Sequence, residues 1–114
     1  MPQSFFSKVV GTTFEGRQDV LEDILEEIGS GQGGHEPNGW QLELRRQPGN
    51  PHDRNAIALY WRDGRQIGFL ERSIAESLAP QIDDGRTVEV VLIEVTGIEP
   101  GFNMGANLRI EVSD

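Results

Sequence analysis

The sequence of 114 residues contains no cysteine, a single lysine (Lys8) and only two histidines. Without cysteine the chain forms no disulfide, and it offers no thiolate for catalysis, iron–sulfur clusters or Cys-based zinc sites. His35 and His52 stand apart, and neither belongs to a His-Glu-x-x-His pattern, so the histidines do not indicate a metal site. We therefore expect no cofactor, no metal ion and no catalytic residue, and we interpret the chain as a binding protein rather than an enzyme.

Long hydrophobic runs are also missing. No segment approaches the roughly 20 apolar residues that cross a bilayer, and residues 1–10 lack the pattern of a signal peptide. Hydrophobic residues make up 36% of the chain and charged residues 25%, which is the composition of a soluble globular protein. We expect one domain over residues 1–114, monomeric and located in the cytoplasm.

Positive charge is scarce, with 10 Lys and Arg against 19 Asp and Glu and a net charge of −9. Such an excess opposes general nucleic-acid binding, which depends on Lys and Arg that neutralise phosphates. Residues 45–72 are the exception, because six Arg against three acidic residues give them a local charge of +3 and leave −12 for the remainder. Charges act locally, within roughly 8 Å at physiological salt, so this segment can attract an anion. The alternative is that these Arg residues simply alternate outward on half-buried strands.

Two helices are expected between strands. Apolar residues recur on one helical face over residues 19–28, and Asp19 with Glu22 resembles an acidic capping box. A second, shorter helix is predicted over residues 74–79, where Ser73 and Glu76 form a capping box and Pro80 ends the helix. The Gly-rich segment 29–39 between the first helix and the next strand predicts a flexible loop without chemistry.

The rest of the chain predicts strands. Residues 5–14 are rich in Phe, Val and Thr. Leu42 and Leu44 alternate with charged residues, and Ile57, Leu59 and Trp61 follow at every second position of the next apolar stretch. An Asp-Gly turn leads into a strand over residues 66–70. We interpret Trp61, just before this turn, as a core residue. Residues 87–96 form a long apolar strand whose phase slips near Val90–Val91, which indicates a bulge, and residues 108–112 form the last strand. Five or six strands with two short helices predict a mostly β fold, a small and partly open barrel with helical insertions.

The loop Asn50-Pro51-His52-Asp53 lies within the arginine-rich segment. Asn and Asp bond their own backbone and Pro fixes φ, so this loop is first of all a tight connection between two strands. That structural role and a binding role both remain open on the residues alone.

The runs "RRQPGNPHDRNAIALYW" and "GRQIGFLERSIAESLAPQIDDG", preceded by "VVGTTFEG", resemble the HIRAN domain family. The resemblance implies an OB-like barrel with helical insertions. It also implies binding of single-stranded DNA with a pocket for the free 3′ end, without a metal ion, next to a helicase or nuclease in DNA repair or processing. A protein-interaction adaptor that keeps the fold but has lost DNA affinity is the alternative, favoured by the net acidity.

Carried over by residue, the resemblance makes Asn50 and Asp53 the polar pair of the loop, with Asp53 accepting a hydrogen bond from the terminal 3′-hydroxyl. It places an aromatic side chain at Phe14 and a phosphate contact at Arg72. Thr12-Thr13-Phe14 stands where the family has Arg-Tyr-Tyr, His52 replaces a Tyr, Phe69 replaces a His and Glu71 adds negative charge, which implies weaker binding or a different ligand. The full predicted nucleic-acid site comprises Thr12, Thr13, Phe14, Arg45, Asn50, His52, Asp53, Arg54, Phe69 and Arg72.

Overall fold

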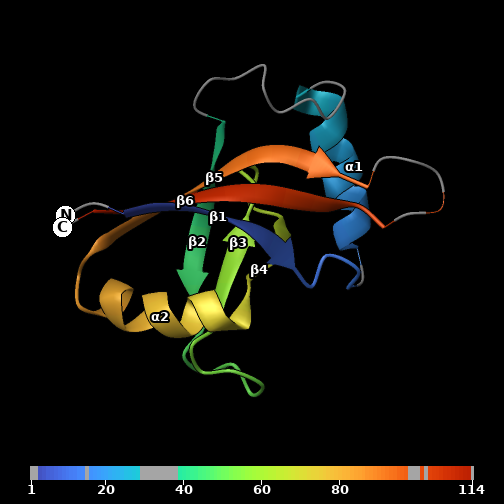
Figure 1. Ribbon diagram of the computed structural model, residues 1–114. Helices are drawn as coiled ribbons and strands as arrows, with labels where there is room; N and C mark the ends of the chain where they lie inside the picture. Colours follow the sequence, from blue (N-terminus) through green and yellow to red (C-terminus); the bar gives the residue numbers. More distant parts are fainter. Residues whose placement is uncertain (1–2, 15, 29–38, 98–100, 102, 114) are drawn as a thin grey trace.

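The computed structural model describes residues 3–14, 16–28, 39–97, 101 and 103–113, so the predicted Gly-rich loop, except Gly39, and His35 lie outside the described residues. Six antiparallel strands form a closed barrel in the order β1-β4-β3-β2-β5-β6 (Figure 1). The strands are β1 (Gln3–Val10), β2 (Trp40–Arg46), β3 (Ile57–Tyr60), β4 (Gln66–Leu70), β5 (Thr87–Thr96) and β6 (Gly105–Ser113). The predicted mostly β barrel with two helices is confirmed, and the ring is closed rather than partly open.

The barrel closes through β1. Over residues 3–8 this strand pairs with β6, and at Val9 and Val10 it pairs with β4. The predicted strand over residues 5–14 is therefore too long at its end, because Gly11 adopts a positive φ of 72° and the chain turns there. Phe14 lies in this turn, outside the strand, and its side chain is 66% exposed.

The core consists of strand side chains that alternate along the strands and of the apolar faces of both helices. Its largest fully buried aliphatic side chains are Leu21, Ile24, Ile57, Leu59, Ile67, Leu78, Val90, Leu92, Leu108 and Ile110. Trp61 is only 2% exposed, which confirms it as a core residue, and its indole Nε1 donates a hydrogen bond to Glu27 Oε2 at 2.8 Å. The molecule thus has one core, shared by the strands and both helices.

Helix α1 (Arg17–Ile28) buries Val20, Leu21 and Ile24, as the apolar pattern predicts. The predicted capping box is wrong, because the helix begins two residues earlier than expected. The Gly16 carbonyl accepts the first helical hydrogen bond from the Val20 amide at 3.2 Å, so Asp19 lies in the first turn and not at the cap.

Helix α2 (Arg72–Asp83) is longer than predicted at both ends and lies on a different side of the barrel from α1 (Figure 1). Its cap residue is Glu71, which makes no side-chain capping hydrogen bond, so Ser73 lies inside the helix and the second predicted capping box is also wrong. Pro80 does not end the helix. Pro80 is exposed to solvent. Water can therefore donate a hydrogen bond to the carbonyl of the preceding turn, which the proline nitrogen cannot do.

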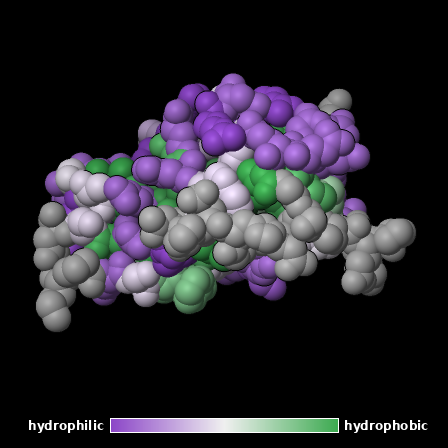
Figure 2. Space-filling view, turned by 90° about the horizontal axis from the view of Figure 1, so that it is seen from above, coloured by the Kyte–Doolittle hydropathy of each residue, from purple (hydrophilic) through white to green (hydrophobic). Residues whose placement is uncertain are grey.

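The bulge predicted near Val90–Val91 lies two residues further on. The pairing of β5 with β6 shifts register between Leu92 and Glu94. Val91 faces outward and is nevertheless buried, because the backbone at Gly39 covers it. The approach is so close that a Cβ on Gly39 would overlap the Val91 side chain. Seen from above, the surface is largely hydrophilic, with hydrophobic residues in small separate patches (Figure 2).

Candidate nucleic-acid interface

A pocket of about 420 Å³, here called the loop pocket, opens where four segments meet. These segments are the end of β1 with the turn into α1, the loop between β2 and β3, the end of β4, and the start of α2. The lining residues are Val10, Phe14, Arg17, Asn50, His52, Asp53, Ala56, Phe69, Leu70 and Arg72. Six of the ten predicted site residues are therefore brought together by the fold, although they come from three separate stretches of the sequence.

Asn50 organises the loop. Its Oδ1 accepts hydrogen bonds from the backbone amides of His52 at 2.8 Å and Asp53 at 3.2 Å, and its Nδ2 donates to Gln47 Oε1 at 3.0 Å. The side chain thus forms an Asx turn of the kind expected for Asn before Pro. Both ends of the amide are engaged within the loop, so Asn50 holds the shape of the pocket wall.

Asp53 divides its two carboxylate oxygens between two tasks. Oδ1 accepts a hydrogen bond from the Asn55 amide at 2.9 Å, which stabilises the turn. Oδ2 lies 3.9 Å from Arg72 Nε, beyond hydrogen-bond distance, and accepts no hydrogen bond within the described part of the chain. The side chain is 20% exposed. The structural and binding roles left open by the sequence are therefore compatible, because each uses a different oxygen.

Arg17 was not predicted, and it is the most confined cation of the loop pocket. Its guanidinium carbon lies 4.7 Å from the centre of the Phe14 ring and 5.2 Å from that of Phe69, and Nη1 donates to the Gly11 carbonyl at 2.8 Å. Burial lowers its pKa, but from so high an ordinary value that the group stays charged. A cation between two aromatic rings is a stable arrangement, and it places positive charge where Thr12 and Thr13 provide none.

Four predicted residues lie outside the loop pocket: Thr12, Thr13, Arg45 and Arg54. The Thr12 carbonyl accepts a hydrogen bond from Gln18 at 2.9 Å, which ties the turn to α1. Arg54 is exposed and its guanidinium makes no hydrogen bond or ion pair among the described residues, so it contributes charge near the loop without lining the pocket. Arg17 was missed because it stands far from the arginine-rich segment, and only folding brings it onto Phe69.

Most arginines of residues 45–72 are paired with carboxylates. Ion pairs within 4 Å join Arg45 to Glu43, Arg46 to Asp83, Arg62 to Glu27, Arg65 to Asp23 and Asp63, and Arg72 to Asp53. The local charge of +3 is therefore largely balanced across the fold. Exposed pairs contribute little free energy, so the exposed Arg72, at 77%, remains able to exchange its carboxylate for a phosphate.

Arg46 differs from the others because it clamps the loop. Only 14% of its side chain is exposed. Its Nη1 donates to the carbonyls of Arg54 at 3.1 Å and Ala56 at 3.0 Å, while Nε and Nη2 bind both oxygens of Asp83 at 3.0 and 3.1 Å. One planar guanidinium thus ties the loop that carries Asp53 to the last residue of α2.

Replacing Arg46 by Lys should loosen this loop. An ammonium cannot form the four hydrogen bonds of the guanidinium fork, so we expect a loss of about 1 to 2 kcal/mol in the free energy of unfolding, measured with urea. The matched control is Arg65→Lys, whose pairs with Asp23 and Asp63 are exposed and should be nearly indifferent to the change. Equal effects of the two substitutions would show that Arg46 is no more than a surface ion pair.

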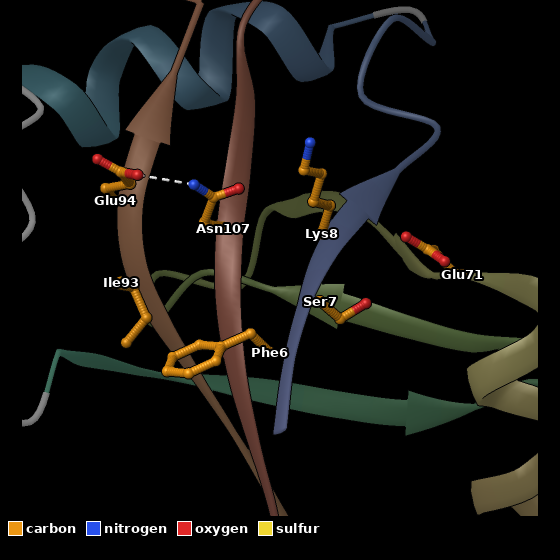
Figure 3. A pocket seen from close by; sticks show the side chains of 7 residues that line it. All are labelled: Phe6, Ser7, Lys8, Glu71, Ile93, Glu94 and Asn107. Atoms are coloured by element: carbon orange, nitrogen blue, oxygen red, sulfur yellow. Dashed lines mark hydrogen bonds between the residues drawn. The ribbon is translucent and has the colours of Figure 1, made fainter. Parts of the chain in front are cut away.

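A second hollow of about 650 Å³ lies elsewhere and contains none of the predicted residues. It is lined by Phe6, Ser7, Lys8, Glu71, Ile93, Glu94 and Asn107. Phe6, which is 75% exposed, lies beside Ile93, and Asn107 donates to Glu94 at 2.7 Å (Figure 3). Two carboxylates against one ammonium make this hollow unsuitable for an anion, although it is the larger of the two.

Among the described residues, no three His, Asp or Glu side chains gather where they could hold a metal ion. In the same part of the chain, no helix is long and apolar enough to span a membrane.

The family model of the HIRAN domain matches residues 2–112. The chain belongs to the HIRAN family. Helicase-like transcription factor from Oryctolagus cuniculus is 34% identical over 59% of this chain, and the Fanconi-associated nuclease 1 homolog from Arabidopsis thaliana is 41% identical over 40% of it. This HIRAN domain spans only 7% and 5% of the lengths of these two proteins.

Solved structures agree with the fold. The crystal structure of the HIRAN domain of human HLTF superimposes with a TM-score of 0.59 and 25% identity, covering 97% of this chain and 77% of that one. A crystal structure of a Lactobacillus plantarum protein gives a TM-score of 0.62 at 17% identity, covering 98% and 97% of the two chains, and it shows the fold alone. HIRAN domains related to this one thus occur in helicase-like and nuclease proteins.

Proposed function

We propose that this HIRAN domain binds single-stranded DNA and holds its 3′ end in the loop pocket, acting with a helicase or nuclease in DNA repair or processing. The observation that carries the proposal is Asp53 Oδ2, which accepts no hydrogen bond among the described residues and lies in a pocket that also contains two arginines and two phenylalanine rings. The occurrence of similar domains in helicase-like and nuclease proteins supports the nature of the partner.

The charges of the pocket favour one kind of DNA end. A carboxylate near a polyanion is unfavourable unless it accepts a hydroxyl proton, and a 3′-hydroxyl offers that proton. A 3′-phosphate would instead bring about −1.5 to −2 further charges towards Asp53. Arg72 can bind a backbone phosphate, and the exposed ring of Phe14 can stack on a base.

Binding should depend only weakly on salt. With two or three phosphates neutralised, the slope of log K against log salt for a single strand should be roughly −1.5 to −2. We would measure it by fluorescence anisotropy with 3′-hydroxyl oligonucleotides, and compare the same oligonucleotides ending in 3′-phosphate. A several-fold steeper slope, or equal affinity for both ends, would contradict a small pocket for the 3′-hydroxyl.

The second candidate is an adaptor that binds protein and not DNA. Two observations favour this adaptor. Phe6 lies beside Ile93 on a face with two carboxylates and is 75% exposed. In addition, five arginines are paired with carboxylates. Absence of binding to every oligonucleotide at low salt would leave the adaptor as the remaining function.

A further inference from the structure

Beyond the loop pocket, a second arginine lies on a second aromatic ring. The guanidinium carbon of Arg45 is 4.3 Å from the centre of the Tyr60 ring, and this pair is called the Arg45–Tyr60 stack here. More than half of the Arg45 side chain is exposed, and Tyr60 is partly exposed. The loop pocket repeats the same chemistry with Arg17 between Phe14 and Phe69.

The strand pairing places the two sites in one row on the outside of the barrel. Val10 pairs with Phe69, Phe69 with Ala58, and Ala58 with Arg45, so these four side chains project from the same face of β1, β4, β3 and β2. Neighbouring strands lie about 4.8 Å apart, so the Cα atoms of Phe69 and Arg45 are separated by roughly 10 Å. Ala58 between them is fully buried, so neighbouring side chains cover the surface between the two sites.

Tyr60 belongs to the same face, because it is two residues from Ala58 on β3. The loop pocket and the Arg45–Tyr60 stack therefore each combine a guanidinium with an aromatic ring.

We propose that the Arg45–Tyr60 stack binds the part of the DNA strand that leaves the loop pocket, with a base on Tyr60 and a phosphate on Arg45. The proposal rests on the proposed function of the loop pocket. A path over α1 is less favourable for the strand, because this helix exposes a row of acidic side chains. Glu43, which now pairs with Arg45, competes with the phosphate, so binding requires that exposed pair to open.

The test uses 3′-hydroxyl oligothymidines of two to six nucleotides and fluorescence anisotropy. The affinity of the unmodified protein should rise by about fivefold or more between two nucleotides and six, because a further base is stacked. Arg45→Gln and Tyr60→Thr should remove most of this gain and leave dinucleotide affinity unchanged to about twofold, since the loop pocket is a separate site. Tyr60→Phe keeps the ring and should keep the gain.

Arg62→Gln is the matched control. Arg62 also lies over an aromatic ring, that of Trp61 at 4.9 Å, and also pairs with a glutamate, Glu27, but it stands at the turn between β3 and β4. With the hexanucleotide, Arg45→Gln should reduce the slope of log K against log salt by about 0.7, one phosphate contact, and Arg62→Gln should not.

Three results would overturn the proposal. The dinucleotide could bind the unmodified protein as tightly as the hexanucleotide, Arg45→Gln could weaken both to the same extent, or Arg62→Gln could equal Arg45→Gln. If none of the oligonucleotides binds, the proposed function fails and this inference fails with it. Failure of the stack alone would leave 3′-hydroxyl binding of the dinucleotide intact, so the two failures are distinguishable.

Discussion

Replacing Asp53 by Asn should remove most of the preference for a 3′-hydroxyl over a 3′-phosphate. The amide loses the charged acceptor at Oδ2, and a charge-assisted hydrogen bond contributes about 1.5 to 3 kcal/mol, so affinity for 3′-hydroxyl oligonucleotides should fall roughly 10- to 150-fold. The turn should survive, because an Asn oxygen can still accept the hydrogen bond that Asp53 Oδ1 takes from the Asn55 amide. Anisotropy titrations with both DNA ends measure the preference, and urea unfolding measures the stability.

Asn50→Asp provides the matched control within the same loop. Its carboxylate can still accept the amide hydrogen bonds of His52 and Asp53, so the turn is retained, but it adds negative charge instead of removing it. Affinity should fall for both DNA ends, with the preference between them kept. An Asp53→Asn variant that retains the full preference would assign Asp53 to the turn alone and strengthen the adaptor function.

The sequence predicted only part of the loop pocket. The predicted part lies in one continuous segment of the chain. Asn50 and Asp53 stand three residues apart, so turn chemistry alone places both in one loop. Arg17 was not predictable in this way. Its contact with Phe69 joins residues 52 positions apart and depends on β1 pairing with β4 through only two residues.

The helices show the same distinction between local and tertiary causes. The apolar face of α1 could be read from periodicity, because Val20, Leu21 and Ile24 must share a side of any helix. The start of α1 and the passage of α2 through Pro80 could not. They depend on the Gly16 carbonyl being in position for the first helical bond, and on Pro80 facing solvent rather than a packed neighbour.

Replacing Gly68 by Ala should destabilise the barrel strongly. Gly68 has a φ of 155°, and a Cβ at this position would overlap the carbonyl oxygen of Val10 and the side chain of Val9. Forced contact in a packed region and a backbone conformation unsuited to L side chains together should cost about 2 to 4 kcal/mol. Urea unfolding would show this as a lower midpoint with an unchanged slope.

The control is Gly64→Ala, which separates backbone strain from close approach. Gly64 also has a positive φ, 92°, but a Cβ there would meet nothing within 4 Å, so its replacement should cost only about 1 to 2 kcal/mol. The excess loss of unfolding free energy at Gly68 would then measure how tightly β4 lies against Val9 and Val10.

Because that short pairing also sets Phe69 beside Val10 in the loop pocket, Gly68→Ala should weaken oligonucleotide binding while Gly64→Ala leaves it intact. Equal destabilisation by the two variants would mean that β1 can move away from β4 at little cost, and that the pocket wall is not fixed by this contact.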